Sequence, residues 1–196
     1  MTTMAKPQKQ PKEIVYRNKY SHIYSQKVDF GSFMKEYFVN EFRERVGILV
    51  IRDGSVLLVR QYRLLIDDLS WEIPGGEVAE NETPRESIIR ECFEETGIRC
   101  RQVKPLLTYN QSLECVQTFT HLFYTKDFDD NHTFTPALNE VQSIQWVPWE
   151  QCFKMIKEGK MNDSFTVLAL LAYRVFEIGK KQEMVDGKNV KLARGV

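Results

Sequence analysis

Residues 90–97, with the sequence RECFEETG, hold three carboxylates at a spacing that could do chemistry. In a helix, Glu91, Glu94 and Glu95 stand at positions i, i+3 and i+4, so they share one face. Each like-charge pair costs about 0.2–0.5 kcal/mol, and a carboxylate in the last turn meets the negative end of the helix dipole at a further cost of about 0.3–1 kcal/mol. Such a segment forms either a solvated charged face, which is the commoner case, or a site that cations neutralise.

The neighbouring residues predict how these carboxylates are positioned. Thr83, Pro84 and Glu86 have the pattern of a capping box with proline at the first helical position, and Gly97 is typical of a residue just past a helix end. We therefore predict a helix over 84–96 whose acidic stripe faces solvent. The preceding loop, WEIPGGEVAENE, is too rich in glycine and proline for a strand or a helix, and it offers backbone carbonyls to that stripe. Mg²⁺ prefers oxygen ligands of this kind. The face opposite the carboxylates is apolar and consists of Ile88, Ile89, Cys92 and Phe93.

The spacing of these residues resembles the Nudix box, and the chain is similar to Nudix hydrolases over roughly residues 15 to 178. Segments outside the box, such as VRQYR before it and the stretch from 140 to 171 after it, look like the ADP-ribose pyrophosphatase branch of that family. The box positions are Gly76, Glu82, Arg90, Glu91, an apolar Cys92, Glu94, Glu95, Gly97 and an apolar Ile98.

The resemblance implies Mg²⁺-dependent hydrolysis of the pyrophosphate bond in a nucleoside diphosphate derivative, with Mn²⁺ as a possible substitute. By position, Glu91, Glu95 and the carbonyl of Gly75 look like metal ligands. Glu94 looks like a further ligand or the residue that orients the attacking water. Arg90 is expected to hold the glutamates through charge-assisted bonds and not to touch substrate. The remaining box residues look structural: Gly76, Glu82 and Gly97.

Substrate binding is implied for two arginines near the end of the first hairpin, because Arg63, and less directly Arg60, stand where the branch has a phosphate-binding arginine. Trp71, Tyr109 or an N-terminal aromatic is a candidate for stacking on a base, although aromatic residues in such patterns more often belong to the core. The branch usually has a proline where this chain has Leu113. ADP-ribose, a nucleotide sugar and a dinucleotide cofactor therefore all stay open as substrates. Two rival functions are an inactive nucleotide-sugar sensor of the same fold and a hydrolase of nucleoside triphosphates or RNA ends.

Composition limits the alternatives. The 196 residues contain 27 basic and 27 acidic residues, so no electrostatic feature favours binding to nucleic acid. No run of 18 apolar residues and no signal-peptide pattern appears, and the four cysteines lack metal-site spacing. We expect a cytoplasmic enzyme that acts on a small molecule, without nucleic-acid or membrane partners.

The order of elements predicts one catalytic domain of the α/β or α+β class. The resemblance makes this a Nudix fold, a mixed sheet sandwiched between helices. We expect a flexible N-terminus at 1–12, a β extension at 13–45 with a turn at Gly31, the Nudix domain at 46–179 and a flexible tail at 180–196. Within the domain we expect a hairpin around Asp53-Gly54, strands at 103–109, 116–126 and 141–147, and two helices that end near 159 and 179. Members of the branch are often dimers that exchange N-terminal strands, so a homodimer is expected; the alternative is a β-hairpin that folds on its own chain without exchange.

Two residues are candidates for the general base that activates the attacking water, Glu94 and Glu140. Glu140 is a candidate because the branch has glutamates in the loop just before the strand expected here at 141–147. We predict that Glu140→Gln lowers kcat by about two to four orders of magnitude with little change in KM, since a lost base affects the chemical step and not binding. Steady-state kinetics over a range of pH and Mg²⁺ concentration measures this. Rescue by added Mg²⁺ would make Glu140 a spare ligand, and an unchanged kcat would assign the base to Glu94.

Overall fold

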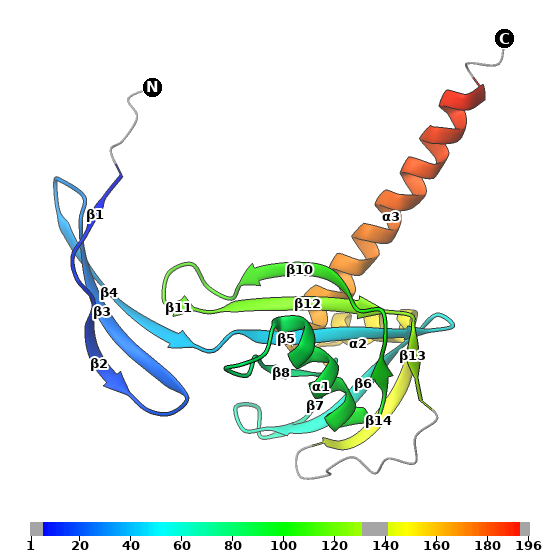
Figure 1. Ribbon diagram of the computed structural model, residues 1–196, viewed down its shortest axis with the longest axis horizontal. Coiled ribbons are helices and arrows are strands. Elements are labelled where there is room, and N and C mark those ends of the chain that lie inside the picture. Colours follow the sequence, from blue (N-terminus) through cyan, green and yellow to red (C-terminus); the bar gives the residue numbers. More distant parts are fainter. Residues whose placement is uncertain (1–5, 131–140, 193–196) are drawn as a thin grey trace.

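The computed structural model describes residues 6–130 and 141–192, with side chains described as far as Gly179. This part of the chain contains a five-stranded sheet, a seven-stranded sheet, a two-stranded sheet and three helices. Figure 1 shows the five-stranded sheet at one end of the molecule, next to the larger sheet and its helices.

The five-stranded sheet forms the N-terminal extension. Gly31, with φ of 84°, turns the chain between β3 and β4 as predicted. No strand is expected before residue 13, yet β1 pairs with the end of β3, so part of the predicted flexible N-terminus is ordered. Exposed polar residues can form such a pair because the ladder uses only backbone groups. The strands are β1 (Gln8–Lys9), β2 (Glu13–Arg17), β3 (Ser21–Asp29), β4 (Met34–Phe42) and β11 (Val116–Gln117).

The seven-stranded sheet is mixed. The predicted hairpin is confirmed: β5 and β6 turn at Asp53 and Gly54, whose φ values of 46° and 77° suit a tight Asp-Gly turn. β12 runs parallel to β5, and β14 runs antiparallel to β6. The strands are β5 (Arg45–Arg52), β6 (Ser55–Arg63), β7 (Asp68–Glu72), β8 (Gly75–Glu77), β10 (Lys104–Asn110), β12 (Phe119–Thr125) and β14 (Val141–Pro148); β9 (Arg99–Cys100) and β13 (Phe128–Asp129) form the two-stranded sheet.

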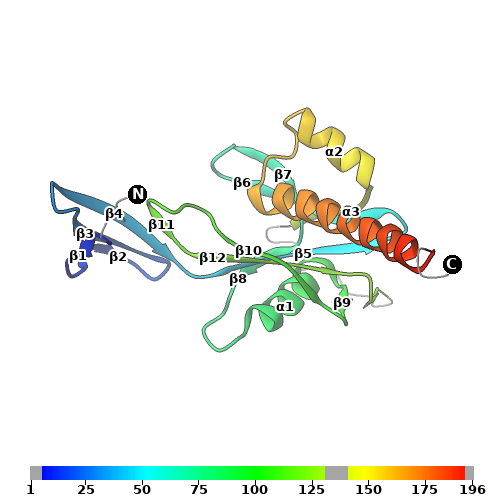
Figure 2. The ribbon, with the colours of Figure 1, turned by 90° about the horizontal axis from the view of Figure 1, so that it is seen from above.

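Helices cover both faces of this sheet, so the predicted arrangement of a sheet sandwiched between helices is confirmed. Figure 2 shows α1 (Pro84–Thr96) on one side and α2 (Trp149–Lys157) and α3 (Ser164–Leu192) on the other. Two apolar clusters fill the two interfaces. One includes Leu58, Met155 and Leu170 beside α2 and α3, and the other includes Leu57 and Ile88 beside α1.

α3 differs from the prediction at its C-terminal end. Asp163 caps it as expected, because its carboxylate accepts a hydrogen bond from Thr166 N at 2.9 Å. The helix then continues to Leu192, past the predicted end at 179 and through most of the segment expected to be a flexible tail. Residues 180–192 lack proline and contain four Lys, one Gln and one Glu, which favour helix, so the helix continues past Gly179. Within the described residues no helix is long and apolar enough to cross a membrane.

The start and end of α1 are confirmed as predicted. The Thr83 hydroxyl accepts a hydrogen bond from Glu86 N, and the Glu86 carboxylate accepts one from Thr83 N at 2.8 Å, which completes the capping box. Gly97 ends the helix in the left-handed conformation with φ of 73°. Both ends of the helix that presents the glutamates are therefore fixed by local hydrogen bonds and not only by packing.

We predict that Thr83→Ala lowers the free energy of unfolding by about 1 kcal/mol, because it removes the acceptor for Glu86 N. Urea unfolding of the purified proteins measures this. Thr83→Ser keeps the hydroxyl and serves as the matched control, so it should unfold close to the native protein. Equal losses in both variants would mean that the methyl group, and not the cap, is responsible.

Candidate active site

Arg90 lies at the centre of the acidic face of α1. Its Nε donates to both oxygens of Glu82, at 3.0 and 3.1 Å, and Nη2 donates to Glu82 Oε2 at 3.1 Å. Its Nη1 donates to Glu91 Oε1 at 2.9 Å and to Glu94 Oε2 at 3.0 Å. These bonds, above all those to Glu82, raise the pKa of Arg90 and keep it charged. The carboxylates of Glu91 and Glu94 are therefore bridged by a cation rather than left to repel each other.

Glu82 ties the loop before α1 to the helix. Besides binding Arg90, its Oε2 accepts a hydrogen bond from Ser87 Oγ at 2.6 Å, and Ser87 Oγ accepts one from Ala79 N at 3.3 Å. The bonds from Arg90 and then Ser87 lower the pKa of Glu82, so it stays ionised. This geometry is that of a structural link, the kind of role expected for Glu82.

The acidic stripe is not uniformly solvated, contrary to the prediction. Glu94 is 55% exposed, whereas the Glu91 side chain is only 18% exposed. Glu95 is largely buried against the preceding loop, where its Oε2 accepts a hydrogen bond from Gly75 N at 3.0 Å. Burial, with a further contribution from Glu91, raises the pKa of Glu95 to about 8. Packing of the loop over this side of the helix, which helical periodicity does not reveal, removes the water.

Two glycines allow this close packing. A Cβ at Gly76 would lie 2.4 Å from Cδ of Glu91, and a Cβ at Gly75 would lie 2.3 Å from the carbonyl oxygen of Val46. Both distances are far below van der Waals contact. At Gly75 the contact is with backbone, so only glycine fits there, whereas at Gly76 a larger residue would displace the Glu91 carboxylate. Both glycines lie in β8, so this part of the segment expected to be a loop is a strand, and its backbone comes directly against the Glu91 side chain.

The chemistry of these carboxylate oxygens suits a hard divalent cation such as Mg²⁺. Glu91 and Glu95 are carboxylates with little water around them, burial raises the pKa of both, and the backbone of Gly75 and Gly76 packs against them. Within the described residues, no three His, Cys, Asp or Glu side chains already stand in a metal-binding arrangement. Arg90 and Gly75 N occupy carboxylate oxygens of Glu91 and Glu95 instead.

Arg63 lies beside this loop and is held by a residue that sequence reasoning missed. Its guanidinium donates to both oxygens of the buried Glu72, with Nε at 2.8 Å, and Gln61 Nε2 donates to Glu72 Oε2 at 3.0 Å. Burial would raise the pKa of Glu72, but its bonds to Arg63 outweigh this and the pKa is lowered. The Arg63 side chain stays 42% exposed and lines a hollow of about 430 Å³ that Gly75 and Asp163 also border. A glutamate in an otherwise apolar strand end, WEIP, is the signal that could have identified Glu72.

Arg60 and Trp71 lie on the other face of the same two strands. Consecutive side chains of a strand alternate between its faces. In β6, Leu58 belongs to the cluster beside α2 and α3, whereas Leu57 belongs to the cluster beside α1. Arg60 therefore shares the α2 side, and its strand partner Trp71 lies with it, the Arg60 Cζ 5.4 Å from the indole centroid.

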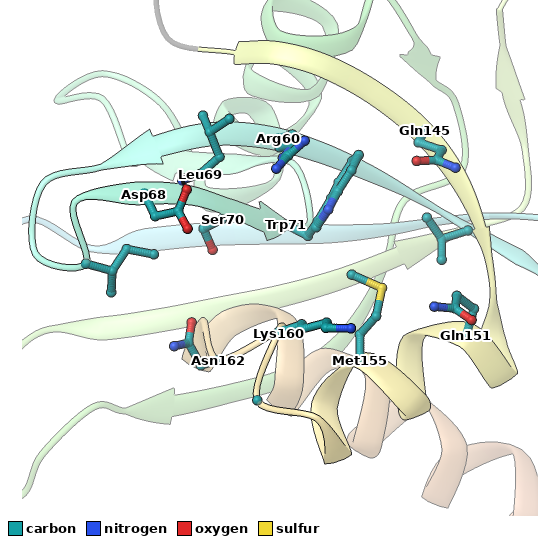
Figure 3. Close-up of a pocket in the computed structure, with 13 residues that line it drawn as sticks. Arg60, Asp68, Leu69, Ser70, Trp71, Gln145, Gln151, Met155, Lys160 and Asn162 are labelled. Atoms are coloured by element: carbon teal, nitrogen blue, oxygen red, sulfur yellow. Dashed lines mark hydrogen bonds between the residues drawn. The ribbon is translucent and has the colours of Figure 1, made fainter.

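The predicted substrate-binding group is thus divided by the structure. Arg63 shares a hollow with the glycine loop, but Arg60 and Trp71 line a separate one together with Met155 of α2 (Figure 3). The structure does not bring Arg60 and Trp71 together with the glutamates. Glu140 lies outside the described residues, and its role stays a prediction.

Comparison with known proteins decides the family. The model for the NUDIX domain matches residues 41–168. The chain belongs to the Nudix family. The box recognised between Gly76 and Ile98 lies inside the match, so the resemblance is confirmed and the chain is a Nudix hydrolase.

Individual relatives place it near the ADP-ribose branch. The CMP-5'-(N-acetyl-N-hydroxy-3-aminopropyl)phosphonate hydrolase of Streptomyces rubellomurinus is 31% identical over 144 residues, which is 72% of this chain and 68% of that protein. The ADP-ribose pyrophosphatase of Bacillus subtilis is 21% identical over 164 residues, or 81% and 88% of the two chains. A crystal structure of an ADP compounds hydrolase matches with a TM-score of 0.80 at 18% identity, over 92% of this chain and 98% of that one. This last likeness confirms the Nudix fold.

The buried position of Glu95 predicts how stability of the metal-free protein depends on pH. Its pKa is near 8 in the folded state and near 4.5 when unfolded, so between these values the folded state retains a proton that the unfolded state has released. Stability therefore falls as pH rises through this window. We predict that Glu95→Gln, which cannot ionise, shows a shallower fall when urea unfolding is followed from pH 5 to 8 with EDTA present.

Glu94→Gln is the matched control, because it makes the same change of charge at an exposed position on the same helix. It should follow the pH dependence of the native protein more closely than Glu95→Gln does. Parallel curves for the native protein and Glu95→Gln would contradict the conclusion that burial raises the pKa of Glu95.

Proposed function

We propose that the protein hydrolyses the pyrophosphate bond of a nucleoside diphosphate derivative, ADP-ribose or a nucleotide sugar, with Mg²⁺ as cofactor and Mn²⁺ as a substitute. The products are a nucleoside monophosphate and the phosphorylated second group. The observation that supports this most is the packing of Gly75 and Gly76 against Glu95 and Glu91, with Arg63 in the adjoining hollow. Carboxylates for cations and an arginine for phosphate thus border the same loop.

The residues have separate roles in this proposal. Glu91, Glu95 and the carbonyl of Gly75 hold the cation, with Glu94 as a further ligand or as the residue that orients the attacking water. When bound, the cation would supply neutralisation of charge on phosphate oxygens and a lowered pKa of water. Arg90 positions Glu91 and Glu94 through its Nη1 and does not touch substrate.

Arg63 binds a phosphate oxygen of the substrate. Its bidentate bond to Glu72 fixes the plane of the guanidinium, and the exposed part of the group faces the hollow beside Gly75. A fixed guanidinium loses little entropy when it binds phosphate, and it can donate two hydrogen bonds at once. Arg60 and Trp71 have no place in this step, because they lie on the other face of β6 and β7.

We further propose that the protein is a homodimer formed through the N-terminal sheet. This sheet exposes large apolar side chains on β2, on β4 and in the turns beside them, which a monomer would leave in water. A second copy of the sheet would cover them. The residues are Ile14, Val15, Tyr16, Tyr20, Phe33, Met34, Phe38 and Phe42, each at least 44% exposed.

The four free cysteines, of which Cys115 is exposed, suit a reducing cytoplasm.

Two other functions compete with this proposal. One is hydrolysis of an RNA end or a nucleoside triphosphate, and the other is a sensor that binds a nucleotide sugar without cleaving it. The equal numbers of acidic and basic residues give no electrostatic basis for RNA binding. The sensor is disfavoured because such proteins typically lose glutamates of the box, and this chain retains all of them.

We predict that the native protein with Mg²⁺ cleaves at least one of ADP-ribose, GDP-mannose, NAD and a CDP derivative, giving a nucleoside monophosphate identified by chromatography and mass spectrometry. Glu95→Gln should lower kcat/KM at least about a hundredfold, which corresponds to about 2.7 kcal/mol of transition-state stabilisation. Glu158→Gln, which alters an exposed ion pair at the end of α2, is the control and should stay near native. Cleavage of 5'-triphosphate RNA alone would favour the rival hydrolase, and no cleavage of any compound would favour the sensor.

A further inference from the structure

A hollow of about 620 Å³ lies between the β6–β7 strand pair and α2 (Figure 3). Trp71, Val147 and Met155 give it an apolar part, and Gln145, Gln151 and Asn162 give it three carboxamides. It is the larger of the two hollows bordered by β6 and β7. A space of this size, apolar on one side with a few polar groups around it, is typical of a small-molecule site.

Arg60 is the polar group most clearly aimed at this hollow. It lies beside the indole of Trp71, with Cζ 5.4 Å from the ring centroid, and lines the hollow with it. Its Nε is buried and has no hydrogen-bond partner within the described part of the chain. A buried donor without an acceptor is unfavourable, and native proteins seldom retain one without a ligand or water to accept the bond. Because Nε has almost no accessible surface, an acceptor in the hollow would satisfy it only if the Arg60 side chain turns towards the hollow.

The charges of the lining favour an anion. Arg60 and Lys160 contribute two positive charges and Asp68 one negative charge, so the hollow is positive by one. Lys160 also pairs with Glu158 at 2.8 Å, but both side chains are exposed and such a pair is weak. The three carboxamides can each donate and accept hydrogen bonds, which suits a ring edge with alternating donors and acceptors.

We propose that this hollow is a second, non-catalytic binding site for a mononucleotide. The base lies against Trp71 with its edge on the carboxamides of Gln145, Gln151 and Asn162, and the phosphate accepts hydrogen bonds from Arg60. The aromatic ring, the hydrogen-bonding edge and the anionic group of a mononucleotide each meet their counterpart here. No part of this site includes the glutamates of α1.

The position of the site determines how it differs from the catalytic one. β6 and β7 separate it from Glu72 and Arg63, whose side chains lie on the opposite face of the same strands. A nucleotide bound here is therefore not cleaved, and its affinity does not depend on a divalent cation. This inference stands without the proposed function, because binding is measured apart from turnover.

The test is isothermal titration calorimetry of the full chain with AMP, CMP, adenosine and inorganic phosphate, with EDTA present throughout. We expect AMP or CMP to bind, and adenosine and phosphate to bind at least about tenfold more weakly, because each lacks one of the recognised groups. Arg60→Met should weaken mononucleotide binding at least about tenfold. Glu95→Gln should bind as tightly as the native protein.

Arg52→Met is the matched control, because Arg52 also lies over a tryptophan, with Cζ 4.0 Å from the Trp146 centroid, at a different surface. Its mononucleotide affinity should be native. Gln151→Ala removes a carboxamide that lines the hollow, so it should weaken mononucleotide binding. Because Gln151 is an exposed side chain of α2, the melting temperature should stay native. This variant keeps the proposal testable even if Arg60→Met fails to fold. The proposal is overturned if no mononucleotide binds without metal, if Glu95→Gln abolishes binding, or if neither Arg60→Met nor Gln151→Ala weakens it.

Discussion

The contact of Gly75 and Gly76 with β5 and α1 is the constraint on which the candidate active site depends. A Cβ would lie 2.3 Å from the Val46 carbonyl oxygen at one glycine and 2.4 Å from the Glu91 carboxylate carbon at the other. Because the loop packs this closely, Gly75 N reaches Glu95, water is excluded from that carboxylate, and α1 is fixed against the sheet. A single added methyl group would have to move the backbone of β5 at Gly75, and at Gly76 it would displace the carboxylate of Glu91.

The β6–β7 pair separates the molecule into two chemically different surfaces. Alternation along the strands places Arg63 and Glu72 beside the glycine loop, and Arg60 and Trp71 beside α2. The motif VRQYR therefore contains two arginines with unrelated surroundings, although they are only three residues apart. One is held by a buried carboxylate, and the other lies over an aromatic ring.

Local patterns predicted the elements that depend on local chemistry. The capping box at Thr83, the Asp53-Gly54 turn and the turn at Gly31 are all present, because their hydrogen bonds and φ values involve residues close in sequence. Features that depend on distant packing were missed. The burial of Glu95, the Arg63–Glu72 pair and the division of the substrate-binding group arise from contacts between segments that no periodicity connects. The length of α3 was also missed, because sequence alone does not show that a polar segment continues a packed helix.

The geometry of Arg90 explains why an arginine suits the centre of this site better than a lysine. One edge of the guanidinium, Nε and Nη2, binds Glu82, while Nη1 on the other side binds Glu91 and Glu94. The two sets of bonds use different nitrogens, so the link between Glu82 and the helix would persist if Glu91 and Glu94 turned towards a cation, as the proposed function requires. An ammonium group is a single point charge and would have to divide its three donors among the same three carboxylates without a fixed plane. The rigid fork thus allows α1 to remain anchored to its loop while its carboxylates change partner.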